Sequence, residues 1–580
     1  MKPMNNIDDN TMKMVNRWLH GAYDDETKST IQQMLDNNPQ ELIESFYRNL
    51  EFGTGGLRGI MGVGSNRMNK YTVGAATQGF ANYLKANFPD LDRIKVAIAF
   101  DSRNNSQYFA KVTADVFSAN DIKVYLFEDL RPTPELSFAI RHFGCQGGIV
   151  ITASHNPKEY NGYKAYWDDG GQLISPHDKN VIDEVNKITD ISDVKFESNP
   201  ELIEVIGEDI DNLYIENIKS LSLSPDAIQR QKALKIVYTP IHGTGAKLVP
   251  MALRSFGFEN IFTIDEQMVA DGNFPTVISP NPEESAALEM ALNLADSVNA
   301  DLVMATDPDA DRVGIAIRKD GKLVLLNGNQ AATLLIYYLL EKWRENGKLT
   351  GKEYIVKTIV TSEILFDIAD KYKVEKFDVL TGFKYIADII KELEGVKTFI
   401  GGGEESYGYL VGDFVRDKDA ISSCAMIAEV AAWAADKGVG LFDLLKNIYK
   451  EFGFYKEDLV SVVRKGKAGA EEIQKMMEGF RDNPPEILND TKLVKIKDYL
   501  SGIEKDVVSG IEKKIKLPKS NVLQFFTEDG SKISVRPSGT EPKIKFYFGV
   551  KAPLAKEDEF EQVNDFLEKR IEGIKKDLGI

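Results

Sequence analysis

The stretch that decides the fold is Gly148-Ile149-Val150-Ile151-Thr152-Ala153-Ser154-His155-Asn156-Pro157, where a short apolar run passes directly into a loop of small and polar residues. The same pattern predicts strands at 95–100, 148–152, 235–238, 301–305 and 397–400. Such runs, alternating with amphipathic stretches, are typical of α/β layers. Because open α/β sheets bind ligands beyond the carboxyl ends of their strands, the loops after these runs are the candidate functional segments.

Composition restricts the class of protein. The chain has 580 residues and a net charge of −18, from 71 Lys and Arg against 89 Asp and Glu. This acidic balance argues against nucleic acid as a partner, since such binding depends on clustered basic residues. Cys145 and Cys424 lie in apolar contexts and are expected to be buried free thiols. No run of 18 apolar residues and no signal-peptide core occurs, so we expect no membrane partner and a cytoplasmic location.

The length predicts three or four domains, at roughly 100 to 200 residues each. Composition changes near 192–208, at a hairpin-like Asp320-Gly321, and near 451–456. We therefore place the domains at 1–207, 208–325, 326–453 and 454–580. Helices are expected at 441–449, within 465–488 and at 557–577.

Three aspartates, Asp307, Asp309 and Asp311, alternate after one predicted strand, and Pro308 restricts the turn between them. Ligation by oxygen alone favours Mg²⁺, Ca²⁺ or Mn²⁺ over Zn²⁺. An EF-hand is excluded, because that loop needs Gly at its sixth place and Glu at its twelfth, where this chain has arginine. The alternative for this loop is a solvated acidic turn.

Ser154 is a candidate nucleophile in the loop that follows the first-quoted strand. A serine that carries phosphate forms a stable monoester, which a divalent cation can polarise. The alternative is an ordinary turn, which uses the same residue types. No Gly-x-Ser-x-Gly elbow surrounds the serine and only five histidines are present, which disfavours an acyl-transfer triad. Together with the aspartates, Ser154 indicates metal-assisted phosphoryl transfer.

Two further loops carry groups that bind sugars and phosphates. The glycine-rich loop at 401–408 contains Glu404 and Ser406, which can hydrogen-bond to sugar hydroxyls. Near the C-terminus, 536–542 joins two strand-like segments, 532–535 and 543–548, and places Arg536 beside hydroxyls and free backbone N–H groups. Such a turn can hold an anion. Plain structural turns are the alternative for both loops.

These four motifs, in this order, resemble those of the α-D-phosphohexomutase family. The phosphoserine loop of that family is similar to 152–157, its metal loop to 307–312, its sugar loop to 403–406 and its phosphate loop to 536–542. Shorter matches at 52–59, 101–103 and 381–384 extend the resemblance over most of the chain. The resemblance implies a heart-shaped molecule of four domains: three similar α/β domains and a smaller α+β C-terminal domain around a central cleft.

The resemblance also implies a mechanism. Phosphorylated Ser154, Asp307, Asp309 and Asp311 would together bind one Mg²⁺. The phosphate on Ser154 would pass to a sugar phosphate, and the resulting 1,6-bisphosphate would turn over and return its other phosphate to Ser154. Glucose 1,6-bisphosphate is the implied activator. Arg58, Lys164 and His155 are implied near the reacting hydroxyl, either for proton transfer or for neutralising phosphate. The implied substrate-binding residues are Glu404, Ser406, Lys384, Lys418, Arg312, Arg536, Ser538, Gly539 and Thr540.

The substrate is predicted from smaller differences. The Glu404-Glu405-Ser406-Tyr407 version of the sugar loop looks like that of glucose-selective members, so we expect interconversion of glucose 1-phosphate and glucose 6-phosphate. The segment 61–69 resembles a branch that includes phosphopentomutases, and phosphopentomutase or phosphomannomutase activity stays an alternative. A metal-dependent phosphatase is a remoter alternative, because five histidines do not supply a two-zinc site. The expected partners are small sugar phosphates, with a monomer or a homodimer left open.

Overall fold

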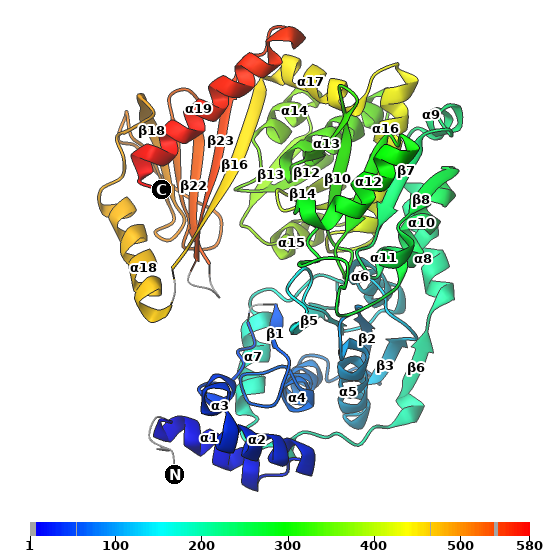
Figure 1. Cartoon of the computed structure of the whole chain (residues 1–580), viewed down its shortest axis with the longest axis vertical. Helices are drawn as coiled ribbons and strands as arrows, with labels where there is room; N and C mark the ends of the chain where they lie inside the picture. The colour runs from blue at the N-terminus through cyan, green and yellow to red at the C-terminus, as the bar shows by residue number, and fades with distance from the viewer. Residues whose placement is uncertain (1–6, 54, 465, 539–542) are drawn as a thin grey trace. The chain divides into compact units, whose positions relative to one another are not determined.

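The computed structural model describes residues 7–53, 55–464, 466–538 and 543–580 (Figure 1). The chain divides into two compact units. The first comprises Met1–Leu326, Ala387–Gly395 and Ser406–Asp436, and the second comprises Asn327–Ile386, Val396–Glu405 and Lys437–Ile580.

Three helices precede the first sheet: α1 (Asp9–His20), α2 (Asp25–Asn37) and α3 (Pro39–Phe46). Each begins after an Asp or Asn whose side chain accepts hydrogen bonds from the first-turn N–H groups, as helix N-caps do. Trp18 and Phe46 pack on one another and, with Tyr71, form a small core at this end of the first unit.

The first sheet has the order β1-β5-β4-β2-β3-β6, and its strands β4, β2, β3 and β6 are parallel. Strand β5 runs antiparallel to both β4 and β1. The bounds are β1 (Gly56–Ile60), β2 (Lys95–Phe100), β3 (Lys123–Phe127), β4 (Gly147–Ile151), β5 (Tyr160–Trp167) and β6 (Ile203–Ile206), with helices α4 (Lys70–Asn87), α5 (Ser106–Ala119), α6 (Thr133–Phe143) and α7 (His177–Lys187).

The second sheet, also in the first unit, has the order β11-β10-β9-β7-β8. Its strands β9, β7 and β8 are parallel, and β10 and β11 form a hairpin whose turn contains Asp320 and Gly321, as predicted. The bounds are β7 (Lys235–Thr239), β8 (Asn260–Thr263), β9 (Leu302–Thr306), β10 (Val313–Lys319), β11 (Lys322–Leu326), α8 (Glu208–Ser220), α9 (Pro225–Arg230), α10 (Gly245–Phe256), α11 (Asp265–Met268) and α12 (Glu289–Val298). Strand β15 (Gly408–Val411) and the buried helix α16 (Ala420–Asp436) belong to this unit too, and α16 packs on α9 and α10.

The second unit contains a parallel set of strands and an antiparallel sheet. Strands β13 and β14 both pair in parallel with β12. The bounds in this part are β12 (Glu353–Thr358), β13 (Glu375–Val379), β14 (Thr398–Glu404), α13 (Gly328–Glu345), α14 (Ile364–Tyr372) and α17 (Leu441–Phe452). Helix α15 (Phe383–Leu393) begins in this unit, and its residues from Ala387 onward belong to the first.

The antiparallel sheet has the order β16-β23-β22-β21-β18-β19-β20, and β17 pairs with β18. Helix α19, red in Figure 1, contacts β16 and β23. The bounds are β16 (Phe454–Val463), β17 (Ile487–Leu488), β18 (Thr491–Asp498), β19 (Ile503–Asp506), β20 (Glu512–Lys514), β21 (Leu523–Thr527), β22 (Lys532–Pro537), β23 (Lys543–Ala552), α18 (Gly466–Asp482) and α19 (Phe560–Leu578). Short 3₁₀ turns occur at Ile191–Asp193, Pro200–Leu202, Ser285–Leu288 and Glu557–Glu559.

The three α/β parts repeat one order of elements. The first is β2-α5-β3-α6-β4-β5, the second is β7-α10-β8-α12-β9-β10 with α11 inserted, and the third is β12-α14-β13-α15-β14-β15. The loop that contains Ser154, called the serine loop below, follows β4. The loop that contains Asp307, Asp309 and Asp311, called the aspartate loop, follows β9, and Glu404 is the last residue of β14. The three predicted functional segments therefore occupy the same place in three copies of one motif.

The glycine run at 401–403 corrects the sequence analysis. It was expected to begin a loop, but it lies in β14, which pairs with β12. A Cβ on Gly402 would lie 2.2 Å from the carbonyl oxygen of Val356, so this close approach of two strands requires glycine. Glu404 is the last residue of β14, and the predicted loop follows it.

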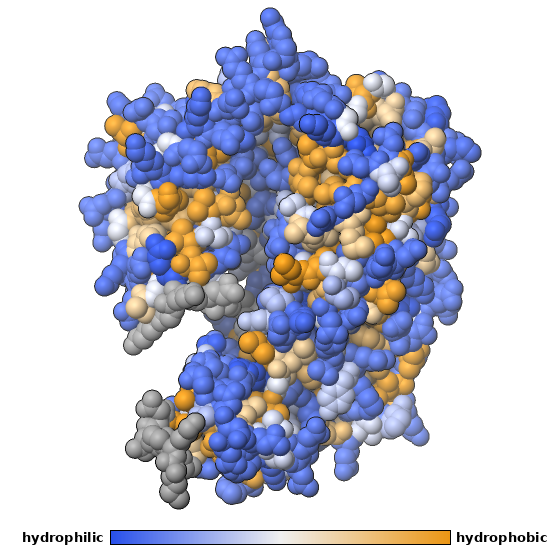
Figure 2. All heavy atoms as spheres, in the orientation of Figure 1, coloured by the Kyte–Doolittle hydropathy of each residue, from blue (hydrophilic) through white to orange (hydrophobic). Residues whose placement is uncertain are grey.

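Hydrophilic residues dominate the face shown in Figure 2, as the 28% of charged residues leads one to expect. Both cysteines are buried and free, as predicted. In the part of the chain that the structure describes, no helix combines the length and the apolar character that crossing a bilayer requires.

Candidate active site

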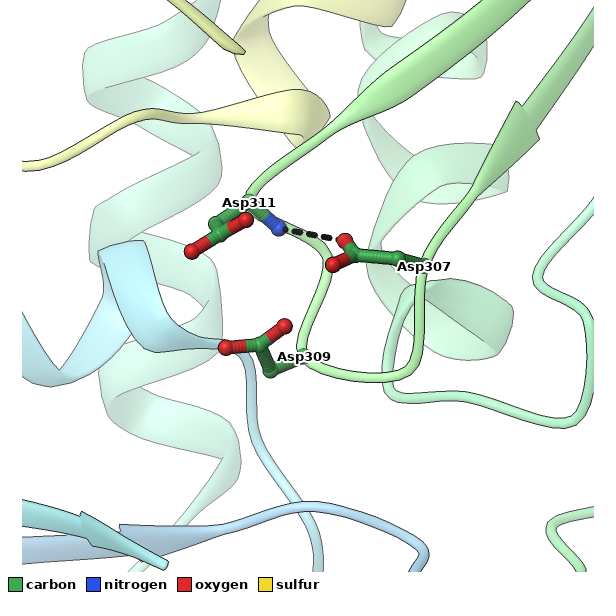
Figure 3. Close-up of side chains that lie close together, drawn as sticks. All are labelled: Asp307, Asp309 and Asp311. Atoms are coloured by element: carbon green, nitrogen blue, oxygen red, sulfur yellow. Dashed lines mark hydrogen bonds between the residues drawn. The ribbon is translucent and has the colours of Figure 1, made fainter. Parts of the chain in front are cut away.

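Asp307, Asp309 and Asp311 form a tight, buried cluster after β9. Each offers a carboxylate oxygen within 4.8 Å of those of the other two, and the side chains point toward one another (Figure 3). Asp307 Oδ1 accepts hydrogen bonds from the backbone N–H groups of Asp311 (3.1 Å) and Arg312 (3.0 Å). Ala310 has a positive φ of 49°, which turns the loop back on itself.

Two lysines partly balance the negative charge of this cluster. Lys164 Nζ donates to Asp309 Oδ2 (2.6 Å) and to Asp311 Oδ2 (3.0 Å), and Lys418 Nζ lies 3.2 Å from Asp311 Oδ2. Burial acts to raise the pKa of Asp311, but Lys164 and Lys418 outweigh it and hold that pKa below its usual value. For Asp307, burial and the two neighbouring carboxylates raise the pKa well above its ordinary value.

The donor set fits a divalent cation. Asp309 Oδ1 and Asp311 Oδ1 are buried and accept no hydrogen bond from the described residues. Leaving a buried carboxylate oxygen without a partner is costly unless a cation or another donor meets it. Hard carboxylate oxygens are the ligands that Mg²⁺, Ca²⁺ and Mn²⁺ take in proteins.

Ser154 lies directly against the cluster. Its Oγ donates to Asp307 Oδ2 at 2.7 Å and lies 3.1 Å from His155 Nδ1. Its backbone has a φ of 52°, a left-handed conformation that is uncommon for residues other than glycine, and such strain often accompanies function. The structure therefore brings the predicted nucleophile and the predicted metal ligands together, although they are 153 residues apart in the chain.

Arg103 stabilises the serine loop through hydrogen bonds to its main chain. This buried guanidinium donates to the carbonyl oxygens of Ser154 (2.6 Å), Asn156 (2.5 Å), Pro157 (2.9 Å) and Tyr160 (3.0 Å). The segment 101–103 resembles the family, but its sequence alone assigns no role to Arg103. The only sequence signal was an arginine in the loop after a buried strand.

Arg58, His155 and Lys164 surround the same loop. Arg58 projects from β1 and its Nη1 donates to Asn156 Oδ1 (3.1 Å). Desolvation, together with nearby arginines, lowers the pKa of His155 well below its usual value. Burial acts to lower the pKa of Lys164, but Asp309 and Asp311 outweigh it and raise that pKa, so the lysine is a stable cation here.

Three of the predicted substrate-binding residues lie in the first unit beside these groups. Arg312 Nη1 donates to Glu283 Oε1 at 2.6 Å, a partner that the sequence analysis missed. Ser406 precedes Tyr407, whose carbonyl oxygen accepts a hydrogen bond from Val313 N (3.0 Å), next to the aspartate loop. Lys418 packs on Gly408, where a Cβ would lie 2.1 Å from Lys418 Cδ.

The other predicted substrate-binding residues lie in the second unit. Glu404 Oε1 accepts a hydrogen bond from Gly382 N (2.9 Å), and Lys384 lies in the first turn of α15. Arg536 lies on β22 opposite Lys545 of β23, and Ser538 N donates to Lys543 O (2.7 Å). Gly539 and Thr540 lie outside the described residues.

Comparison with known proteins identifies the family. Sequence profiles described as phosphoglucomutase/phosphomannomutase match in four segments: alpha/beta/alpha domain I at 49–192, domain II at 212–321, domain III at 327–452 and the C-terminal domain at 487–567. The four matches confirm the predicted fold class of three α/β domains followed by a C-terminal domain.

Relatives and solved structures agree with these profiles. The chain is 36% identical over 561 residues to a phosphoglucomutase of Staphylococcus haemolyticus, covering 96% of this chain and 97% of that protein. It is 37% identical over 544 residues to one of Staphylococcus aureus strain MRSA252, covering 92% and 95%. The fold is similar to that of the phosphoglucomutase parafusin of Paramecium, with a TM-score of 0.66 at 19% identity over 91% of this chain and 95% of that one. A family protein of Burkholderia thailandensis gives 0.62 at 17% identity, over 90% and 97%. The chain therefore belongs to the phosphoglucomutase/phosphomannomutase family, whose members are the α-D-phosphohexomutases that its motifs resemble.

Proposed function

We propose that this phosphosugar mutase is a phosphoglucomutase, which interconverts α-D-glucose 1-phosphate and glucose 6-phosphate through phosphorylated Ser154. The observation that carries the proposal is the 2.7 Å hydrogen bond from Ser154 Oγ to Asp307 in a buried cluster of three aspartates. The relatives named phosphoglucomutase, at 36% and 37% identity over most of the chain, support glucose phosphate as the substrate.

The reaction consists of two phosphoryl transfers in opposite directions. In the first, a free sugar hydroxyl oxygen attacks the phosphorus on Ser154, a new O–P bond forms, the Oγ–P bond breaks, and the hydroxyl proton passes to the released Ser154 Oγ. The bound 1,6-bisphosphate then turns over. Ser154 Oγ attacks its other phosphorus, the sugar O–P bond breaks, and the proton of Oγ passes to the released sugar oxygen. No water is consumed, so the site must exclude water between the two transfers.

The charged groups in the first unit suit this chemistry. Mg²⁺, the cofactor that we propose for Asp307, Asp309 and Asp311, supplies Lewis-acid polarisation of a phosphoryl oxygen when bound. Lys164 is a buried cation that contacts the aspartate cluster and can neutralise phosphate charge, and Arg58 can do so from β1. His155 is within reach of Ser154 Oγ for proton transfer.

For the substrate we propose that Glu404 and Ser406 bind sugar hydroxyls. Arg536, Ser538 and Thr540 would hold the phosphate that is not being transferred. Gly539, Lys384, Lys418 and Arg312 are the other residues that we propose to bind the substrate. We also propose the domain bounds 1–207, 208–325, 326–453 and 454–580, activation by glucose 1,6-bisphosphate, a cytoplasmic location, and a monomer or homodimer.

Initial rates of the purified protein test this proposal. The assay contains Mg²⁺ and glucose 1,6-bisphosphate and compares glucose 1-phosphate, mannose 1-phosphate and ribose 1-phosphate, with free phosphate measured in parallel. Preference for glucose 1-phosphate without phosphate release is the expected result. Preference for ribose 1-phosphate or mannose 1-phosphate would identify the protein as a phosphopentomutase or a phosphomannomutase instead. Stoichiometric release of free phosphate would identify it as a phosphatase.

Ser154→Ala tests the phosphoserine directly. We expect kcat to fall about 10³-fold or more, because the phosphate carrier is lost, and intact mass spectrometry should show no phosphoryl group after incubation with glucose 1,6-bisphosphate. The matched control is Ser118→Ala, which removes another buried serine hydroxyl. Ser118 lies in the last turn of α5, and its hydroxyl donates to Asp115 O. Activity that survives in Ser154→Ala would contradict the mechanism.

A further inference from the structure

Thr133, the first residue of α6, contacts the aspartate loop in two ways. Its backbone N–H donates to the carbonyl oxygen of Asp309 (3.0 Å), and its hydroxyl donates to Asp309 Oδ2 (2.8 Å). The threonine is fully buried. In Figure 3, α6 is the pale blue helix that begins beside Asp309. A residue 176 positions earlier in the chain thus holds both the main chain and the side chain of one candidate metal ligand.

These contacts fix the orientation of the Asp309 carboxylate. Oδ2 accepts from both Thr133 Oγ1 and Lys164 Nζ, whereas Oδ1 accepts no hydrogen bond from the described residues. Rotating the carboxylate would break two hydrogen bonds at once, one of them to a cation, and such bonds stabilise more than neutral ones. Oδ1 is therefore the oxygen that stays available to a cation.

The start of α6 is itself firmly anchored. Arg131, two residues before Thr133, donates from Nε and Nη2 to the two carboxylate oxygens of Asp211 (2.6 and 3.0 Å), and Lys247 Nζ donates to the same carboxylate (2.5 Å). Asp211 is fully buried on α8. The backbone N–H of Arg131 donates to Phe100 O at the end of β2 (3.0 Å). The Thr133 hydroxyl is therefore presented from a fixed position.

Thr133 and Lys164 differ in what else attracts them. Lys164 is a cation that donates to Asp309 and Asp311, in the same aspartate cluster that Ser154 contacts through Asp307, so a phosphate on that serine would attract its ammonium group away from Asp309. The Thr133 hydroxyl is neutral and fully buried, and it meets no such competitor. We propose that Thr133 is a positioning residue for the metal centre, whose hydroxyl keeps Asp309 aimed at the cation when Lys164 turns to phosphate. The inference rests on the metal that we propose at the three aspartates.

Metal binding without substrate provides the first test. Purified Thr133→Val, Thr133→Ser and wild-type protein are titrated with Mn²⁺ alone, and free Mn²⁺ is followed by its electron paramagnetic resonance signal. Residues that orient a metal ligand typically contribute about 10- to 100-fold in affinity. We expect the Kd to rise about 10-fold in Thr133→Val and to return close to the wild-type value in Thr133→Ser. Thr113→Val is the matched control, since it removes a buried hydroxyl that donates to Phe109 O in α5, and it should leave the Kd unchanged.

The activity of the same variants gives the second readout. Thr133→Val should need about 10-fold more Mg²⁺ for half-maximal rate, while the KM for glucose 1-phosphate at saturating Mg²⁺ stays near the wild-type value. A general loss of structure would not raise the Mg²⁺ requirement while leaving the KM for glucose 1-phosphate unchanged. Nor would Thr133→Ser then restore the wild-type Mg²⁺ requirement. Should Thr133→Val not fold, Thr133→Ala replaces it with the same expected results.

Two outcomes overturn the inference: an unchanged Mn²⁺ Kd in Thr133→Val, or a Thr133→Ser variant as weak as Thr133→Val. A wild-type protein that binds no Mn²⁺ would contradict the proposed metal centre itself. A wild type that binds Mn²⁺ but lacks mutase activity would contradict the proposed function and leave the Thr133 test intact. The failure of each proposal is therefore recognisable by itself.

Discussion

At the scale of single residues, Arg103 offers a sharp test of how the serine loop is positioned. One guanidinium satisfies four carbonyl oxygens of that loop, and a lysine ammonium, with three donors and no planar fork, cannot replace it. We expect Arg103→Lys to lower kcat at least about 10-fold, because Ser154 then loses its fixed position, and to lower the free energy of unfolding by about 2 kcal/mol.

Steady-state kinetics and denaturant unfolding measure these two effects of Arg103→Lys. The exposed Arg93→Lys is the control for a general loss of guanidinium and should change neither. If Arg103→Lys keeps both the wild-type kcat and full phosphorylation of Ser154, the loop does not depend on the guanidinium for its position.

The site residues that can be predicted from the sequence are those whose role follows from their immediate neighbours in the chain. Ser154 and the three aspartates stand in short runs directly after apolar strands, so residue type and position together indicate their chemistry. Thr133 and Glu283 carry no local signal, because each acts through a partner brought near only by the fold. A threonine between two prolines is typical of any helix start, and only the structure shows that this hydroxyl meets Asp309.

At the scale of elements, β16 carries a buried carboxyl group that makes stability depend on pH. Burial raises the pKa of Glu457 to about 7 from an ordinary value of 4.5, while Ser362, Lys532 and Lys456 oppose the shift. Between these values the unfolded chain loses the proton and the folded chain keeps it, so the free energy of unfolding falls as pH rises from about 4.5 to about 7. Well above pH 7 the carboxyl group is ionised in both states, and the free energy of unfolding no longer falls with pH.

Glu457→Gln removes this ionisation. We expect the variant to gain stability relative to the wild type as pH rises through that window, to a limit of about 3 kcal/mol, and to hold that difference at higher pH. Urea unfolding at a series of pH values measures this difference in stability. Below pH 4.5 the carboxyl group of Glu457 is protonated in both the folded and the unfolded chain, so the comparison of the variant with the wild type there is the internal control. A difference that is constant over the whole range would show that Glu457 ionises alike in the folded and unfolded chain.

Sequence predicted the kinds of elements better than their ends. The runs at 95–100 and 148–152 correspond to β2 and β4, and the helix expected within 465–488 is α18. The run at 397–400 continues through three glycines to Glu404, because β14 pairs closely with β12 there. Glycine favours turns in isolation, and only tertiary pairing overrides that preference. The residues show no internal repeat, so the threefold repetition of the α/β motif was expected only from the family resemblance; it lies in the order of the strands and helices.

At the scale of the whole molecule, the two compact units divide the chemistry unevenly. Ser154, the three aspartates, Lys164 and Lys418 all belong to the first unit, whereas Glu404, Lys384 and Arg536 belong to the second. A ligand stabilises the part of a protein to which it binds, by an amount set by its concentration relative to its Kd. Metal should therefore stabilise the first unit without acting directly on the second.

Differential scanning calorimetry tests this division. A chain of several domains need not unfold in one step, and we expect separable transitions for the two units. Mg²⁺ at about 100 times its Kd adds about 2.7 kcal/mol to the state that binds it, which should raise one transition by about 3 to 5 °C. Asp309→Asn should abolish that shift, and Glu457→Gln at pH 8 should raise the other transition instead, because Glu457 lies in the second unit. If Mg²⁺ and Glu457→Gln raise the same single transition, the two units unfold together, and metal bound by the aspartates then stabilises the whole chain.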